Sequence, residues 1–376
     1  MLDGFKELAV LRKGDASGNR MVLRLTTHRG TNIHAIGVPQ DWPSRTGPTW
    51  TYLFENDGLT LVDAGAVGSF RALTEGIAQA GFQVQDIDRV IITHGHADHD
   101  GAAAQLADEA GAEVWAHEIY AHLLDYDPWE IDRPASPVQA WLDAVVKSEP
   151  ESGRSADNRR RHESYLRARE RLEVTHTIRA EDRSGGLTFI HAPGHSPDEL
   201  CVTLDEVVFT GDHVLPEITP HPTTKVRLPL EVKRNLPPEY HDEDKFYGLA
   251  TYLRTLKGIV DLGPGVKVLP AHRLFNKNRF NFQDVRRAGE IIEHHALRLR
   301  RIMLEIGPQP TDLEAVTRGI FQGRKLVGGN LYMALLEVVA HVEFLQDTGD
   351  LEITEGRVLQ RTGSENYRQR IAELTS

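Results

Sequence analysis

Residues 93–101 read THGHADHDG and follow the short apolar run VII at residues 90–92. The β-branched run predicts a buried strand, so the nine residues lie on the loop that leaves it. Alternate side chains of an extended chain share a face, and His94 and His96 can therefore reach one ion together. Asp98 and His99 are adjacent and suit a second ion beside the first. The alternative is a polar loop whose histidines only form hydrogen bonds, but imidazoles and a carboxylate at this spacing favour a metal site.

Three later segments could supply further ligands, because one loop cannot complete two coordination shells. His195 follows an apolar strand and a Pro-Gly turn, Asp212 follows the run VVF at residues 207–209, and His272 follows the segment VKVLPA at residues 266–271. Each of the three, taken alone, is also typical of an ordinary loop residue. Four strand ends of the same kind in one chain predict a common site.

Taken together, these motifs resemble those of the metallo-β-lactamase superfamily, whose T-H-x-H-x-D-H-x-G motif stands here at residues 93–101. Its later motifs are matched by PGH at 193–195, GD at 211–212 and LPAH at 269–272, and an upstream match is LVDAG at 61–65. The resemblance spans roughly residues 20–280 and implies an α/β fold, the αββα sandwich of that family. The chain departs from the usual pattern at Ala102, where a second glycine is frequent, and at Arg273, which follows His272 in place of glycine.

The resemblance also implies a ligand set for two divalent ions. One ion would be held by His94, His96 and His195, the other by Asp98, His99 and His272, with Asp212 bridging the two. Zinc is the expected metal, although a shell of histidine and aspartate also accepts manganese or iron.

The expected chemistry follows from these ions. A hydroxide that bridges two ions is available near neutral pH, and the same ions polarise a carbonyl or phosphoryl oxygen. In the expected mechanism the hydroxide attacks an acyl carbonyl, Asp98 orients it, and either a metal-bound water or His213 protonates the leaving group. The alternative role for His213 is a hydrogen bond behind the ligands. We expect Arg273 to bind an anionic group of the substrate; the alternative is that it pairs with an acid and braces its loop.

Composition is that of a globular enzyme. The 376 residues are 40% hydrophobic and 26% charged, and no apolar run is long enough for a membrane span. We expect no secretory signal, because the first residues, MLDGFKE, lack a basic start and an apolar stretch. The single cysteine, Cys201, excludes an internal disulfide and favours a cytoplasmic protein. Some β-lactamases of the family use a cysteine ligand where Asp212 stands here, so the resemblance argues against antibiotic hydrolysis.

We expect two domains, a catalytic domain at 1–280 and a C-terminal domain at 281–376. Within the second, the pattern predicts a long helix over 283–306, a helix from Thr311 with Glu314 completing a capping box, and a third over 331–346. A hairpin over 351–360, turned at residues 355–356, follows. This order resembles a winged-helix module, as in a branch of the superfamily that contains endoribonucleases and many bacterial hydrolases.

Charge separates the candidate functions. Residues 281–376 hold 12 Lys and Arg against 14 Asp and Glu, and the whole chain carries a net charge of −12, which disfavours a phosphate-binding surface. The seven arginines at 154–171 could contact phosphates, but a solvated helix face is the simpler interpretation. We therefore expect hydrolysis of an ester-like acyl bond (a thioester, lactone or small ester) of a small molecule, with metal-dependent endoribonuclease activity as the alternative. A catalytically inactive binding protein is disfavoured because every ligand position is filled. We expect the C-terminal module to serve packing or homodimerisation.

Overall fold

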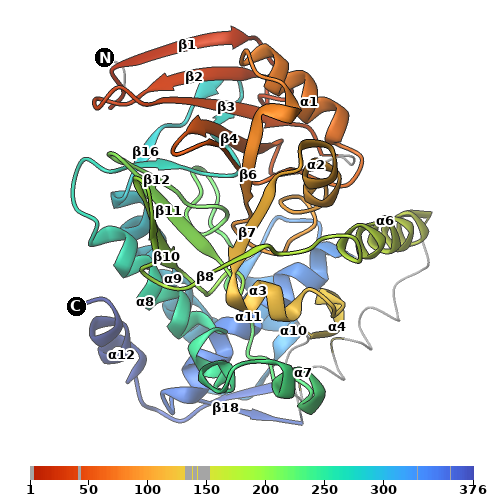
Figure 1. Cartoon of the computed structure of the whole chain (residues 1–376). Coiled ribbons are helices and arrows are strands. Elements are labelled where there is room, and N and C mark those ends of the chain that lie inside the picture. The colour runs from red at the N-terminus through yellow and green to blue at the C-terminus, as the bar shows by residue number, and fades with distance from the viewer. Residues whose placement is uncertain are drawn as a thin grey trace.

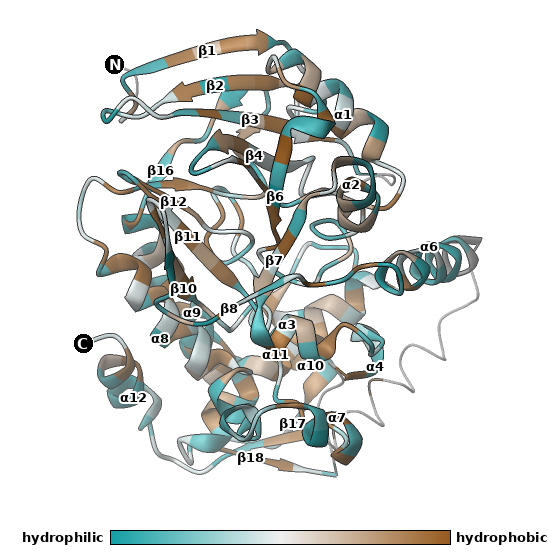
Figure 2. Cartoon of the chain, in the orientation of Figure 1, coloured by the Kyte–Doolittle hydropathy of each residue, from teal (hydrophilic) through white to brown (hydrophobic). Residues whose placement is uncertain are grey.

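The computed structural model describes residues 4–40, 44–131, 138, 142, 153–327, 329–355 and 357–376 (Figure 1). Two sheets lie face to face, and a core of large apolar side chains from both fills the space between them. The rings of Phe54 in the first sheet and Phe209 in the second stack with their centroids 5.1 Å apart. Figure 2 shows that hydrophobic residues are concentrated on the central strands, whereas the projecting helix α6 (Gly153–Arg169) is mostly hydrophilic.

The first sheet has eight strands in the order of the chain. They are β1 (Glu7–Arg12), β2 (Val22–Thr26), β3 (Asn32–Val38), β4 (Thr49–Glu55), β5 (Leu59–Val62), β6 (Ile87–Ile91), β7 (Glu113–His117) and β8 (His176–Ile178). Pairing is antiparallel from β1 to β5 and parallel from β5 to β8. The parallel half brings the ends of β5, β6 and β7 to one edge, which positions the loop at residues 93–101.

The second sheet has six strands in the order β16-β13-β12-β11-β10-β9. They are β9 (Arg183–Ser184), β10 (Leu187–His191), β11 (Leu200–Leu204), β12 (Val207–Phe209), β13 (Lys267–Leu269) and β16 (Gln283–Asp284). Only β12 and β13 pair in parallel among these strands, so the residues that follow them leave the sheet in the same direction. A short hairpin of β14 (Phe275–Asn276) and β15 (Arg279–Phe280) follows β13.

Helices cover the outer faces of both sheets. Against the first sheet pack α1 (Phe70–Gln79), the 3-10 turn η1 (Val84–Asp86) and α2 (Ala103–Ala110), and against the second pack α8 (Leu249–Val260) and the first turns of α9 (Arg286–Ile306). The layers thus run helix, sheet, sheet, helix, as the expected αββα sandwich requires.

Two connections carry extra elements around this sandwich. Between β7 and β8 lie α3 (Glu118–Leu123), α4 (Pro128–Ile131) and α6. After β12, the proline-rich segment has no regular structure until α7 (Leu230–Asn235), followed by the 3-10 turns η2 (Pro238–Tyr240) and η3 (Glu243–Lys245). Apolar side chains of α3, α4 and α7 share one buried cluster, which joins the two connections.

The C-terminal region is helical with a small sheet. It contains α9, α10 (Leu313–Ile320), α11 (Gly329–Asp347), α12 (Tyr367–Leu374) and the strands β17 (Thr311–Asp312), β18 (Leu351–Thr354) and β19 (Val358–Arg361). These strands pair in the order β17-β19-β18. A buried cluster joins the helices to α8 of the sandwich. The predicted domain boundary between residues 280 and 281 stays a prediction. Just after it, β16 still pairs with β13 of the second sheet, and α9 begins at Arg286.

Several local predictions are confirmed. The helices expected over 283–306 and 331–346 are α9, which begins three residues later than expected, and α11. The hairpin of β18 and β19 is also present, although Gly356 of its predicted turn lies outside the described residues. Among the helices described, none is long and apolar enough to cross a membrane.

The predicted cap at Thr311 is wrong. Asp312 is the N-cap of α10, and its carboxylate accepts a hydrogen bond of 2.8 Å from the backbone of Glu314. Thr311 pairs with Leu359 of β19, so its backbone is held in a strand, and its hydroxyl donates to the carbonyl of Ile306 instead.

Candidate metal centre

All seven predicted ligands lie at one edge of the sandwich, at the ends of four strands. The loop after β6, residues 93–101, is called the metal loop below, and it carries four of them. The other three follow β10, β12 and β13. Backbone hydrogen bonds fasten these segments together, since Leu200 donates to the carbonyl of Thr93 at 2.7 Å and Ala271 donates to that of Gly211 at 2.9 Å. The first of these contacts joins the two sheets, and the second joins two strand ends of the second sheet.

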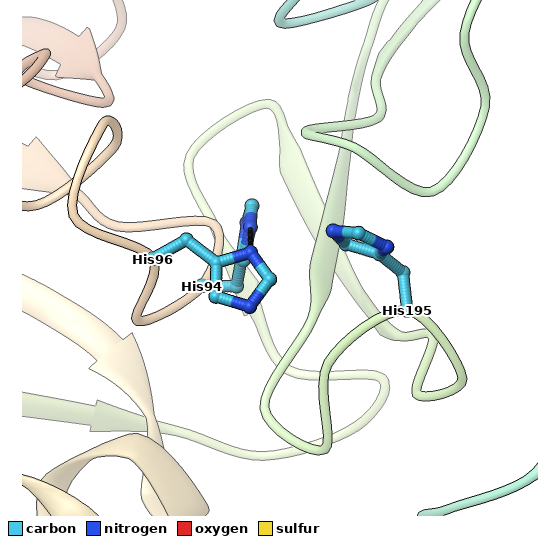
Figure 3. Close-up of side chains that lie close together, drawn as sticks. All are labelled: His94, His96 and His195. Carbon is cyan, nitrogen blue, oxygen red and sulfur yellow. Dashed lines mark hydrogen bonds between the residues drawn. The ribbon is translucent and has the colours of Figure 1, made fainter. Parts of the chain in front are cut away.

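The first group of candidate ligands consists of His94, His96 and His195. One ring nitrogen from each residue lies within 4.8 Å of the others, and Nε2 of His94 is 2.8 Å from Nδ1 of His96. Figure 3 shows His94 and His96 on one loop and His195 facing them from another. Three imidazoles that converge in this way match the histidine shell of a zinc site.

The second group consists of Asp98, His99 and His272, whose ligand atoms also lie within 4.8 Å of one another. Oδ2 of Asp98 is 3.2 Å from Nε2 of His272. Gln40, which the sequence analysis did not identify, donates from Nε2 to the same carboxylate oxygen at 2.6 Å and so fixes its orientation.

Asp212 lies between the two groups. Its Oδ2 is 3.6 Å from Nε2 of His195 in the first group, and its Oδ1 is 3.4 Å from Nε2 of His272 in the second. Oδ1 is also 3.7 Å from Nε2 of His99. One carboxylate thus presents one oxygen to each group, which is the arrangement of a bridging ligand.

Buried polar atoms show that these residues fit metal ions. Nε2 of His99, Nε2 of His195 and Oδ1 of Asp212 are all buried and have no hydrogen-bond partner among the described residues. An unsatisfied buried polar atom costs about 1–3 kcal/mol. Three such atoms that face a common space are explained by cations that would take their lone pairs.

Three of the imidazoles are also hydrogen-bonded through their second ring nitrogen, Nδ1. Nδ1 of His99 is 2.8 Å from Oδ2 of Asp63, that of His272 is 2.9 Å from the carbonyl of Pro48, and that of His195 is 3.1 Å from the carbonyl of His221. A proton on Nδ1 donates in each pair, which leaves the lone pair of Nε2 for a metal.

Two buried carboxylates support the ligands without belonging to either group. Asp63, at the end of β5, accepts hydrogen bonds from the backbone and hydroxyl of Thr93, both at 2.9 Å, as well as from His99. Glu199 has Oε2 3.5 Å from Nδ1 of His94 and accepts the backbone N–H of Asp212 at 3.1 Å. The upstream motif at 61–65 indicated Asp63, whereas Glu199 was missed; its one sequence signal is an acid directly before the apolar strand β11.

Burial sets the protonation of the first group. It lowers the pKa of His94 and His195 far below the usual range and that of His96 to about 4, and the neighbouring imidazoles add to the effect for His94 and His195. These rings are therefore neutral at pH 7, as metal ligation requires.

Nearby carboxylates shift the pKa values in and beside the second group. Burial alone would lower the pKa of His99, but Asp63, Asp98 and Asp212 raise it well above the usual value. Burial raises the pKa of Asp212, an effect that the nearby carboxylates reinforce. The surplus of negative charge would be neutralised by a cation.

The other two predicted catalytic residues lie outside both groups. His213 is fully buried, its ring lies at 82° to the ring of Tyr252 with 5.1 Å between centroids, and burial lowers its pKa to about 3. The role of His213 as the acid for the leaving group stays a prediction. Arg273 donates to the carbonyl of Arg45 and lies 3.9 Å from Glu217, as in the alternative that it braces its loop.

The sequence and the fold both match known proteins. The model of the metallo-beta-lactamase superfamily matches residues 44–272. The chain is 27% identical over 283 residues to the probable metallo-hydrolase YqjP of Bacillus subtilis (strain 168), covering 68% of this chain and 80% of that protein.

Solved structures with 22% identity share the fold. A beta-lactamase domain protein from Burkholderia ambifaria gives a TM-score of 0.63 and covers 90% of this chain and 96% of its own. A metallo-beta-lactamase family protein from Thermus thermophilus gives 0.59 and covers 88% and 98%. With its family motifs gathered at one edge of an αββα sandwich, the chain belongs to the metallo-β-lactamase superfamily.

Proposed function

We propose that this protein is a binuclear metal-dependent hydrolase that cleaves an ester-like acyl bond, in a thioester, a lactone or a small ester. The observation that carries the proposal is the position of Asp212, with one oxygen toward each of two groups of ligands. The relative named as a probable metallo-hydrolase supports the reaction class.

In this proposal each group holds one divalent ion, zinc being the expected metal. Ions held there would lower the pKa of water and polarise a carbonyl oxygen, which is the chemistry that metal-dependent hydrolysis requires. Other residues of the chain orient the side chains of the candidate ligands. In the second group, Gln40 fixes the carboxylate of Asp98, and Asp63 and the carbonyl of Pro48 orient the rings of His99 and His272.

A small-molecule substrate is favoured over RNA because several arginines of the 154–171 segment already have partners. Arg160 pairs with Asp157, Arg171 pairs with Asp108, and Arg169 is buried. We further propose that the C-terminal region is a winged-helix-like module, since helices α9, α10 and α11 accompany a three-stranded sheet, and that it serves packing or homodimerisation.

A turnover screen of the zinc-loaded protein tests the reaction class. Acyl thioesters, lactones, aryl esters and a single-stranded RNA are compared at the same enzyme concentration, each with and without a chelator. We expect chelator-sensitive hydrolysis of at least one acyl substrate and none of the RNA. Chelator-sensitive cleavage of RNA with no acyl turnover would instead support the endoribonuclease alternative.

A further inference from the structure

The insertion between β7 and β8 reaches the back of the metal loop through two residues of α6. Tyr165 is the one tyrosine in this arginine-rich helix, and Arg169 is its last residue. Both side chains are buried, and Arg169 is 5% exposed, whereas the side chain of Arg160 on the same helix is 75% exposed. One arginine of the run is therefore part of the interior.

The hydroxyl of Tyr165 contacts the metal loop at two points. It is 2.9 Å from the carbonyl of Gly95, between two ligands, and 2.9 Å from Oδ2 of Asp100, next to a third. A phenol has one proton, so it is shared between these two acceptors, while Nη1 of Arg169 donates to the phenol oxygen at 3.0 Å. The tyrosine thus links the beginning and the end of the ligand run.

Arg169 fastens this link to the rest of the protein. Its Nη1 is 3.4 Å from Oδ2 of Asp100, and its Nη2 donates to the carbonyls of Leu123 and Leu124 at 3.0 and 3.1 Å. Tyr120 of α3 donates to the same oxygen of Asp100 at 2.8 Å. A guanidinium is suited to this role because its planar fork can serve several acceptors at once.

The side chains behind the metal loop pack closely against it. A methyl group at Gly95 would lie 3.0 Å from Cε2 of Tyr120 and 3.2 Å from Nη1 of Arg169. A loop held this closely has little freedom to change the spacing of His94 and His96.

We propose that Tyr165 and Arg169 are positioning residues for the metal ligands, and that docking of α6 sets the metal affinity of the centre. The proposal rests on the proposed function, because it takes the two ligand groups as metal sites. Within the described part of the chain, no hydrogen bond or ion pair joins either residue to a ligand side chain, so they act through the backbone of Gly95 and through Asp100.

The test measures zinc affinity of the full chain by competition with a chromophoric chelator. We expect Tyr165→Phe and Arg169→Met to weaken zinc binding by about 10- to 100-fold, the usual effect of losing a group that orients a ligand. The controls are Tyr240→Phe, whose hydroxyl donates to Glu118, and Arg160→Met on the exposed face of α6. Both should bind zinc as the wild type does.

A second readout separates positioning from simple destabilisation. The visible absorption of the cobalt-loaded protein reports the ligand geometry, and it should change in Tyr165→Phe, which loses one oxygen and keeps its ring in place. Unchanged zinc affinity and an unchanged cobalt spectrum in folded Tyr165→Phe would overturn the positioning role while leaving the hydrolase proposal intact. A wild-type protein that binds no divalent metal would overturn both.

Discussion

Replacing Asp212 with alanine should lower kcat/KM of the metal-loaded enzyme by about 10²- to 10⁴-fold, the range that a loss of several kcal/mol of charge stabilisation produces. The carboxylate faces both ligand groups, so its loss would change how each proposed ion is held. The free energy of unfolding of the metal-free protein should stay within about 1 kcal/mol of wild type. Oδ1 of Asp212 makes no hydrogen bond to the described residues, and the side chain lies among other carboxylates.

The measurement pairs kinetics with chemical denaturation. Asp212→Asn keeps the shape and one oxygen and should retain more activity than alanine. Asp261→Ala, which removes an exposed carboxylate paired with Lys257 on α8, is the control and should match wild type in both assays. An Asp212→Ala enzyme with wild-type kcat/KM would show that the bridge assignment is wrong.

Replacing Asp63 with alanine should cost about 3–5 kcal/mol of the free energy of unfolding, the range for removing one partner of a buried charged network. Three donors lose their acceptor together: the backbone N–H of Thr93, its hydroxyl, and Nδ1 of His99. Asp63 is 1% exposed, so bulk water does not reach these donors in the native fold.

Backbone strain must be separated from this loss, because Asp63 has a φ of +58°. Glycine adopts that conformation freely, whereas for alanine it costs about 1–2 kcal/mol. Asp63→Gly should therefore recover only that fraction of the alanine penalty, and Glu173→Ala, at an exposed position, should change stability by less than about 0.5 kcal/mol. If Asp63→Gly were as stable as wild type, strain rather than the hydrogen bonds would explain the alanine effect.

Local sequence was sufficient to predict the seven candidate ligands. The spacing of the metal loop fixes which side chains share a face, and the apolar runs before His195, Asp212 and His272 mark where strands end. The resemblance supplied how the ligands divide between two ions, and the structure shows the two groups with Asp212 between them.

The contacts by which distant segments position the candidate ligands could not be predicted from the sequence. Arg169 was one of seven arginines in a polar stretch, and its contacts with Asp100 and Leu123 depend on how the insertion docks. Glu199 and Gln40 act on ligands far from them in sequence, and no periodicity encodes such pairs. The cap of α10 was misplaced by one residue because pairing of Thr311 with β19 is a tertiary contact.

Metal stoichiometry tests the central claim, a centre of two ions, most directly. The purified protein is stripped with a chelator, dialysed to equilibrium against increasing free zinc, and analysed for zinc per chain by elemental analysis. The two groups joined by Asp212 predict a plateau at about two equivalents. A plateau at one equivalent or below would contradict the binuclear centre.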